Sequence, residues 1–253
     1  MSKTTFVDAV VVALELSGRQ GSVAIGRGGR VLVERTFEHG LRHAAGVVPL
    51  VEASLREQGL STSDVGGVAV SGGPGSFTGL RISITLAKTW RMAADMRGTP
   101  LELVLVPTAR VLAENMADDV RLVSTMLDAK RGQVFSGSYA REAGGGWQEL
   151  RSARLIRLDE LLGEAKAGGW CERYGRHVLV GEGIAYHLKP GEAVEGAEIC
   201  DESLWRASAG ATYRVALEMA GRGEVVQDAD AMVPIYVRLP EAEEKYQAAL
   251  GAK

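Results

Sequence analysis

The sequence predicts an α/β fold made of two similar lobes, each consisting of a mixed β-sheet with flanking helices. Two observations lead to this prediction. The order of three strands, a helix and a fourth strand occurs twice, about half a chain apart. In each copy the first strand ends on an acidic residue, and the fourth strand runs into a glycine-rich turn. A repeat of this kind indicates two units of the same architecture.

The first copy begins with short β-branched runs, separated by glycine turns, that predict a meander of three strands. A helix with an apolar face follows, and Gly59 is a suitable residue just after its end. The fourth strand is expected to end near Ser71, because the residues from Gly72 to Pro74 cannot continue it. The predicted ranges are strands 10–16, 22–25 and 30–36, helix 43–58, strand 68–71, helix 80–96 and strand 101–106.

The second copy follows a short helix and repeats the same order before a closing helix and a charged tail. The predicted ranges are helix 108–115, strands 122–127, 133–141 and 147–156, helix 158–165, strand 177–180, helix 207–221, an extended piece at 233–238 and the tail at 240–253. We therefore expect a first domain at 1–107 and a second, smaller lobe at 108–253. The closing helix could pack back on the first lobe.

The composition is that of an ordinary globular protein, with 253 residues, 46% hydrophobic and 24% charged. The net charge of −3 and the lack of a basic block argue against a main nucleic-acid-binding surface. Two cysteines are too few for a disulfide framework, so we expect a reducing cytoplasm. The apolar run at 9–14 is too short to span a bilayer, and we expect neither a signal peptide nor a membrane anchor.

The most informative stretch is 68–90, in which a strand, a glycine-rich loop and a helix follow one another. Such a loop can bind an anion, because free N–H groups and the helix dipole point at it. Alternatively, the glycines only make a tight turn and let the helix pack close to the strand. The loop is not a Walker A motif, and its glycines miss the dinucleotide-binding spacing by one residue. Ser76 and Thr78 could each accept from N–H groups at the helix start.

This loop resembles the signature of the bacterial TsaB (YeaZ) family, whose fold is actin-like (Hsp70-like, ASKHA, RNase H-like). Two further segments match that family: Asp128-Ala129-Lys130-Arg131-Gly132, and the Pro-x-Tyr-x-Arg run that starts at Pro234. Together the matches span nearly the whole chain. The residues of the signature loop, a phosphate site or its vestige, are Gly73, Pro74, Gly75, Ser76, Phe77, Thr78, Gly79 and Arg81.

The resemblance implies a non-catalytic, cytoplasmic subunit with no catalytic residue, cofactor or metal of its own. Its partner would be TsaD, which it activates in threonylcarbamoyl transfer to the tRNA adenosine next to the anticodon. The ATPase TsaE would join the complex, and tRNA would be met only indirectly through the complex. A homodimer could form through the same surface.

By the same resemblance, the two helices of the first half pack against their counterparts in TsaD as a helical bundle. The helix at 80–96 supports this, because it is apolar over more than the stripe that one sheet can cover. The sequence does not separate the side chains that face the partner from those that face the core. The candidates are Val47, Leu50, Val51, Leu55, Ile82, Leu86 and Trp90.

An alternative is an ATP-dependent enzyme, an ATPase or a kinase, of the actin-like superfamily. Glu15 and Asp128 end equivalent strands, and in nucleotide-hydrolysing relatives an acid at the first place helps to hold the metal and phosphates. The other interpretation is that each acid caps a turn. TsaB chains usually read Asp-Thr-Ser-Thr where this chain reads Glu-Leu-Ser-Gly from Glu15, which removes two hydroxyls and weakens ATP binding.

The weakest alternative is a metallopeptidase, which would rest on His39 and His43. Their spacing places both imidazoles on one face of a helix, as zinc sites require. No Glu follows His39, so the pattern of zinc peptidases is absent.

Overall fold

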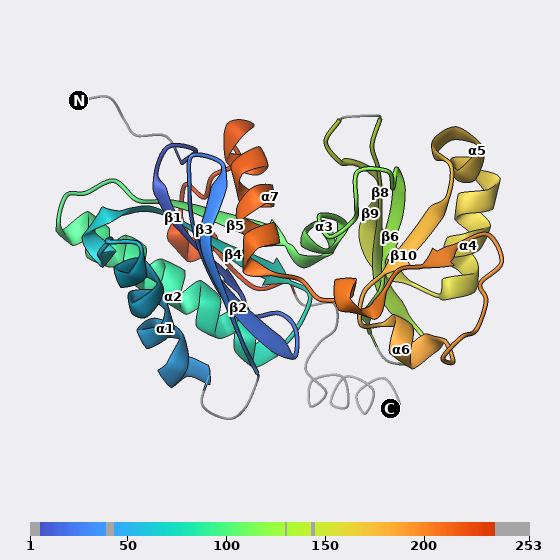
Figure 1. The fold of residues 1–253 in the computed structure, drawn as a ribbon, viewed down its shortest axis with the longest axis horizontal. Helices are drawn as coiled ribbons and strands as arrows, with labels where there is room; N and C mark the ends of the chain where they lie inside the picture. The colour runs from blue at the N-terminus through green and yellow to red at the C-terminus, as the bar shows by residue number, and fades with distance from the viewer. Residues whose placement is uncertain (1–5, 39–42, 130, 143–144, 236–253) are drawn as a thin grey trace, which may run out of the picture.

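The computed structural model describes residues 6–38, 43–129, 131–142 and 145–235. Two β-sheets lie side by side, each with helices packed on its faces (Figure 1). The sheets have five and six strands. The architecture is therefore the predicted one of two α/β lobes with mixed sheets.

The first sheet has the strand order β3-β2-β1-β4-β5. Its first three strands form the expected antiparallel meander, and β4 and β5 run parallel to β1. The strands are β1 (Val10–Glu15), β2 (Gln20–Arg27), β3 (Arg30–Glu38), β4 (Val65–Gly73) and β5 (Glu102–Pro107), and the helices packed on them are α1 (His43–Glu57), α2 (Phe77–Met96) and α7 (Ala209–Gly221).

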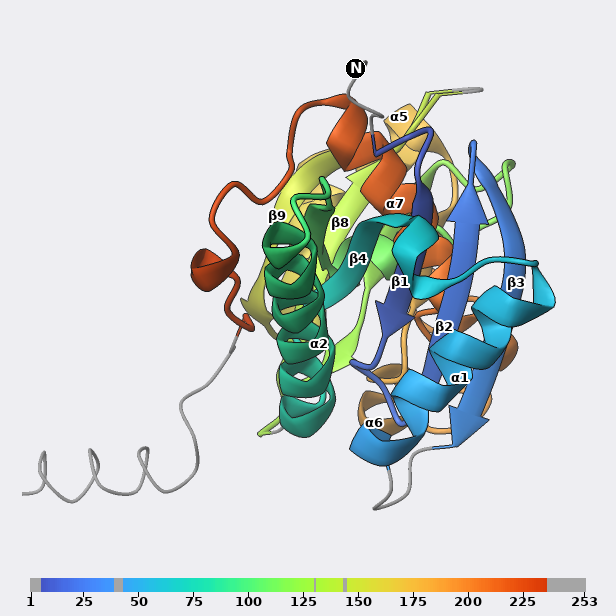
Figure 2. The same cartoon turned by 90° about the vertical axis from the view of Figure 1, so that its left-hand side faces the viewer.

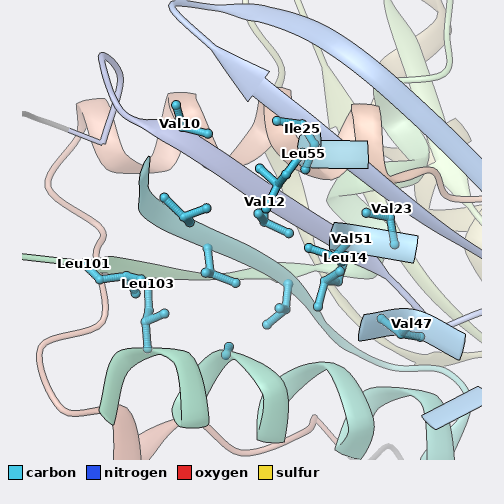
Figure 3. Packing of buried hydrophobic residues seen from close by; sticks show 14 of the residues in the cluster. Val10, Val12, Leu14, Val23, Ile25, Val47, Val51, Leu55, Leu101 and Leu103 are labelled. Carbon is cyan, nitrogen blue, oxygen red and sulfur yellow. The ribbon is translucent and has the colours of Figure 1, made fainter. Parts of the chain in front are cut away.

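Alternation along β1 gives this sheet a core on each face. Val10, Val12 and Leu14 pack beneath α1 and α2, in the cluster shown in Figure 3. Val11 and Ala13 point to the other face and pack against α7. The closing helix thus covers the first sheet, on the side opposite α1 and α2 (Figures 1 and 2). The division of the chain into domains at residue 107 stays a prediction.

The second sheet has the order β11-β10-β6-β8-β7, and β9 pairs with β8. The core on one face is formed with α3, and that on the other with α4 and α5. The elements are α3 (Thr108–Ala113), β6 (Leu122–Thr125), β7 (Leu127–Asp128), β8 (Val134–Ala140), β9 (Gln148–Ile156), α4 (Leu158–Ala167), α5 (Trp170–Tyr174), β10 (His177–Val180), α6 (Ile184–His187) and β11 (Glu198–Ile199).

Several predicted boundaries were wrong. β4 begins at Val65 and runs through Gly72 to Gly73, where β5 still pairs with it. Glycine fits there because a Cβ on Gly72 would lie 2.8 Å from the Leu105 side chain. The predicted strand at 122–127 is two strands that break at Met126. α5, α6 and β11 were not predicted, since they are too short to show a periodic pattern.

The final extended piece is described only as far as Ile235, and it is not a strand there. The segment still belongs to the first lobe, because Val226 N–H donates to Leu103 O at 2.8 Å and Ile235 N–H donates to Gly72 O at 2.7 Å. Met232 is buried in the core beneath α2. Short 3-10 turns lie at Thr62–Asp64 (η1), Glu202–Leu204 (η2) and Ala229–Ala231 (η3).

Candidate functional site

The signature loop joins β4 to α2, and it is held by the turn that follows β1. Ser76 is the N-cap of α2, since its side chain accepts from Gly79 N–H at 3.2 Å. The backbone N–H of Ser76 donates to the carbonyl of Ser17 at 2.6 Å. Of the two predicted capping residues, Ser76 caps the helix, whereas Thr78 lies within its first turn.

The glycines of this loop allow two backbones to approach closely. A Cβ on Gly79 would lie 1.9 Å from the carbonyl oxygen of Leu16, and one on Gly75 would lie 2.4 Å from that of Ser17. The chain's own backbone therefore occupies the space in front of this helix N-terminus. This geometry favours the close-packing interpretation of the loop over the phosphate-binding one.

The second lobe repeats the arrangement after β10. A Cβ on Gly181 would lie 2.3 Å from the Met126 carbonyl oxygen, and one on Gly183 would lie 2.6 Å from the same atom. Gly183 N–H donates to that oxygen at 2.8 Å. In both lobes, the backbone that follows the first strand packs closely against the glycines of the loop after the fourth strand. The break at Met126 exists because its carbonyl is turned toward this loop.

The two acids that end equivalent strands have different surroundings. Glu15 is fully buried, and it accepts from Ser17 N–H at 2.7 Å, Ser71 Oγ at 3.0 Å and Thr212 Oγ1 at 3.2 Å. Burial raises the pKa of Glu15, and these hydrogen bonds partly offset the rise. Glu15 therefore does not line an open cleft, contrary to the expectation for it as a cleft acid. Its hydrogen bonds tie β1 to β4 and α7.

Asp128 remains partly exposed at the end of β7. Its Oδ1 lies 3.6 Å from Nε2 of His187 in α6. This contact connects the turn after β7 to the helix that follows the second glycine loop. The sequence did not identify three residues that make these contacts: Tyr186 and His187 of α6, and Thr212, which donates to Glu15. Nothing in the local sequence around them indicates contacts with such distant parts of the chain.

Of the seven candidate interface residues, Val47, Val51 and Leu55 are buried in the core beneath α1. They expose no surface to a partner, because the inner face of α1 packs on the sheet. The other four are half-buried and lie at the margin of the same core. These four are Leu50, Ile82, Leu86 and Trp90.

One contact shows which side of α2 the apolar residues Ile82, Leu86 and Trp90 occupy. Lys88 Nζ donates to Asp230 O of η3 at 3.1 Å, and Figure 2 shows the red η3 segment on one side of α2 and α1 on the other. Ile82, Leu86 and Trp90 lie roughly opposite Lys88 around the helix. These three side chains therefore form a half-buried apolar flank directed toward α1.

Large exposed apolar side chains are spread over the helices and the final segment of the first lobe. The α1, α2 and 225–235 segments carry most of those found in the described chain. They are Val48, Phe77, Met92, Met96, Val233 and Ile235. Arg81 lies over the ring of Phe77, 4.5 Å from its centroid, so an arginine stacked on an aromatic is exposed at the start of α2.

The residues that the structure describes contain neither a metal-binding cluster nor a membrane-spanning helix. Among them, no three His, Cys, Asp or Glu residues gather in a way that could hold a metal ion. His39 lies outside them, so the His39–His43 hypothesis falls partly beyond the described chain. No helix within the described ranges has the length and apolarity needed to cross a membrane.

Two α/β lobes of the same strand order, each with a glycine loop that meets its first hairpin, define a protein of the actin-like class. The family model described as "TsaD: tRNA N6-adenosine threonylcarbamoyltransferase" matches residues 38–174, more than half of the chain. The chain belongs to this family, within its TsaB (YeaZ) group. The family is one of tRNA threonylcarbamoyladenosine biosynthesis.

Curated relatives and solved structures agree with this membership. TsaB of Bacillus subtilis is 28% identical over 239 residues, which cover 93% of this chain and 97% of the relative. TsaB of Escherichia coli is 28% identical over 164 residues, 61% of this chain and 68% of the relative. The structure of YeaZ from Pseudomonas aeruginosa superposes with a TM-score of 0.71 at 24% identity, covering 90% of this chain and 99% of that one.

Proposed function

We propose that the chain is a non-catalytic subunit that binds TsaD and activates it in threonylcarbamoyl transfer to the tRNA adenosine next to the anticodon. The observation that carries the proposal is the apolar flank of α2, formed by Ile82, Leu86 and Trp90. A row of two half-buried aliphatic side chains and a half-buried aromatic, one helical turn apart, is typical of a surface that another protein covers. A helix of TsaD laid along α1 and α2 would cover it.

The proposed complex acts in the cytoplasm, with TsaE as a further member and with tRNA met only indirectly through the complex. A homodimer through the same flank is the competing use of this surface. The alternative of an ATP-dependent enzyme finds less support, because the Leu16–Ser17 backbone fills the glycine loop and Glu15 is buried.

The test is co-elution of the chain with TsaD of its own organism on a sizing column, followed by a tRNA threonylcarbamoylation assay with and without the chain. We expect one peak of the combined mass and transfer that depends on the chain. Two separate peaks with unaffected transfer would refute the proposal. A peak at twice the mass of this chain alone, which TsaD does not disperse, would assign the flank to a homodimer.

A pair of matched variants locates the surface. Leu86→Asp places a charge on the apolar flank, and Leu32→Asp places the same charge on exposed Leu32 of β3, on the edge strand of the sheet. We expect Leu86→Asp to weaken TsaD binding by at least about tenfold, which corresponds to about 1.4 kcal/mol, and Leu32→Asp to leave it unchanged. Thermal unfolding of both variants checks that the fold is retained. Equal binding by the two variants would show that the flank is not the interface.

A further inference from the structure

The turn between β1 and β2 contacts both lobes. On the side of its own lobe, the carbonyl of Ser17 accepts from Ser76 N–H at 2.6 Å, at the start of α2. On the other side, the guanidinium of Arg19 donates to the hydroxyl of Tyr186 in α6 and lies 5.7 Å from the centroid of its ring. One short turn therefore joins the signature loop of the first lobe to a helix of the second.

A second contact between the lobes supports the first. An ideal Cβ on Gly18 would lie 3.7 Å from the carboxylate of Glu182, so the backbone of the turn lies against the second glycine loop. Glu182 itself pairs with Arg206 at 3.4 Å, just before the chain returns to the first lobe as α7. The turn between β1 and β2 therefore contacts a glycine loop that an ion pair with Arg206 also stabilises.

The helix that carries Tyr186 is firmly positioned. Gly183 N–H donates to Met126 O at 2.8 Å, and His187 lies 3.6 Å from Asp128. Tyr186 therefore contacts Arg19 from a helix whose first residues are hydrogen-bonded to the backbone of the second lobe. By contrast, Arg19 and Tyr186 are both exposed to water, so their contact is weak enough to open and close.

We propose that the turn at Ser17, Gly18 and Arg19 is a latch between the lobes that keeps the signature loop and the start of α2 in place. When Arg19 holds Tyr186, the Ser17 carbonyl stays against Ser76 N–H. When the lobes part, Arg19 leaves Tyr186, the turn gains freedom, and the Ser17–Ser76 hydrogen bond breaks more often. The latch is a property of the free chain and does not depend on TsaD.

Hydrogen exchange at single amides, followed by NMR on the full chain, tests the latch. Arg19→Ala and Tyr186→Ala should each raise the exchange rate of the Ser76 amide by about twofold to fivefold, as expected for the loss of an exposed cation–aromatic contact. The amide of Val226, which donates to Leu103 O away from the turn, should keep its rate in both. The double variant should exchange no faster at Ser76 than either single variant.

Arg173→Ala is the matched control, because Arg173 lies over the ring of Tyr174 at 5.0 Å within the second lobe. It removes an arginine–tyrosine ring contact that does not bridge the lobes, and Ser76 should exchange as in the unmodified chain. The latch is refuted if Arg19→Ala leaves the Ser76 rate unchanged, or if Arg173→Ala raises it equally. Because the readout needs no partner, a failure of TsaD binding would leave this result interpretable.

Discussion

Acid should destabilise the second lobe through His177. This residue of β10 is 1% exposed, and its Nε2 lies 2.8 Å from Ser124 Oγ. Ser124 Oγ in turn lies 2.7 Å from Ser138 Oγ, and Arg151 of β9 reaches the same cluster. Burial, with a further contribution from the charge of Arg151, lowers the pKa of His177 from 6.5 to about 4. The folded chain therefore keeps this histidine neutral.

The sign and size of the effect follow from proton linkage. Below pH 6.5 the unfolded chain binds a proton at His177 that the folded chain does not bind until about pH 4. The stability present above pH 6.5 is therefore lost progressively between these values. A difference of 2.5 pKa units corresponds to about 3 kcal/mol of unfolding free energy.

The assay is urea denaturation of the chain and of His177→Gln at several values between pH 7 and pH 4. The unmodified chain should lose about 3 kcal/mol more than the variant over this range, because glutamine has no proton to bind. Comparison with the variant cancels the other titrating groups, including Glu15, which acts with the opposite sign. Parallel curves for the two proteins would refute the assignment of a buried, neutral histidine.

Three further outcomes are expected. Gly79→Ala should destabilise the chain by about 1–3 kcal/mol or more in urea denaturation, because the added Cβ would lie 1.9 Å from the Leu16 carbonyl oxygen. Gly46→Ala is the control and should not be destabilising, because a Cβ there meets open space. Equal effects of the two substitutions would contradict the close-packing interpretation of the loop. Burial raises the pKa of Glu15 above 4.5, so the stability that the protonated carboxyl contributes is lost as pH rises through the folded pKa. Glu15→Gln should abolish this loss of unfolding free energy. The same dependence of unfolding free energy on pH in the variant and the unmodified chain would contradict the prediction. ATP with Mg²⁺ should leave the thermal midpoint unchanged, whereas a nucleotide bound at a hundredfold of its dissociation constant would add about 2.7 kcal/mol.

The sequence predicts the elements well where a periodic pattern is long. The meander and the two long helices were predicted because their apolar residues recur with the period of a strand or a helix. Gly59 was predicted as the residue after α1, and the structure gives it a φ of +67°, a conformation that glycine adopts readily. The short helix α6 lacks such a pattern, so it was missed together with Tyr186 and His187.

The function of the glycine loop was beyond prediction from local sequence. A helix N-terminus can hold an anion or accept a nearby backbone, and both uses need the same glycines. The choice depends on how closely the turn at Leu16 and Ser17 approaches Gly75 and Gly79, which is a long-range property. The burial of Glu15 depends in the same way on Thr212, almost two hundred positions along the chain.

The position of α7 has a consequence for how the protein is made. The first sheet is complete in sequence by Pro107, yet the face that carries Val11 and Ala13 stays uncovered until Tyr213 and its neighbours are synthesised. A ribosome delivers the chain from the N-terminus, so the first lobe reaches its final packing only after the residues of α7 have been synthesised. A fragment that ends at residue 107 would expose this apolar face, so we expect it to aggregate rather than fold as an independent unit.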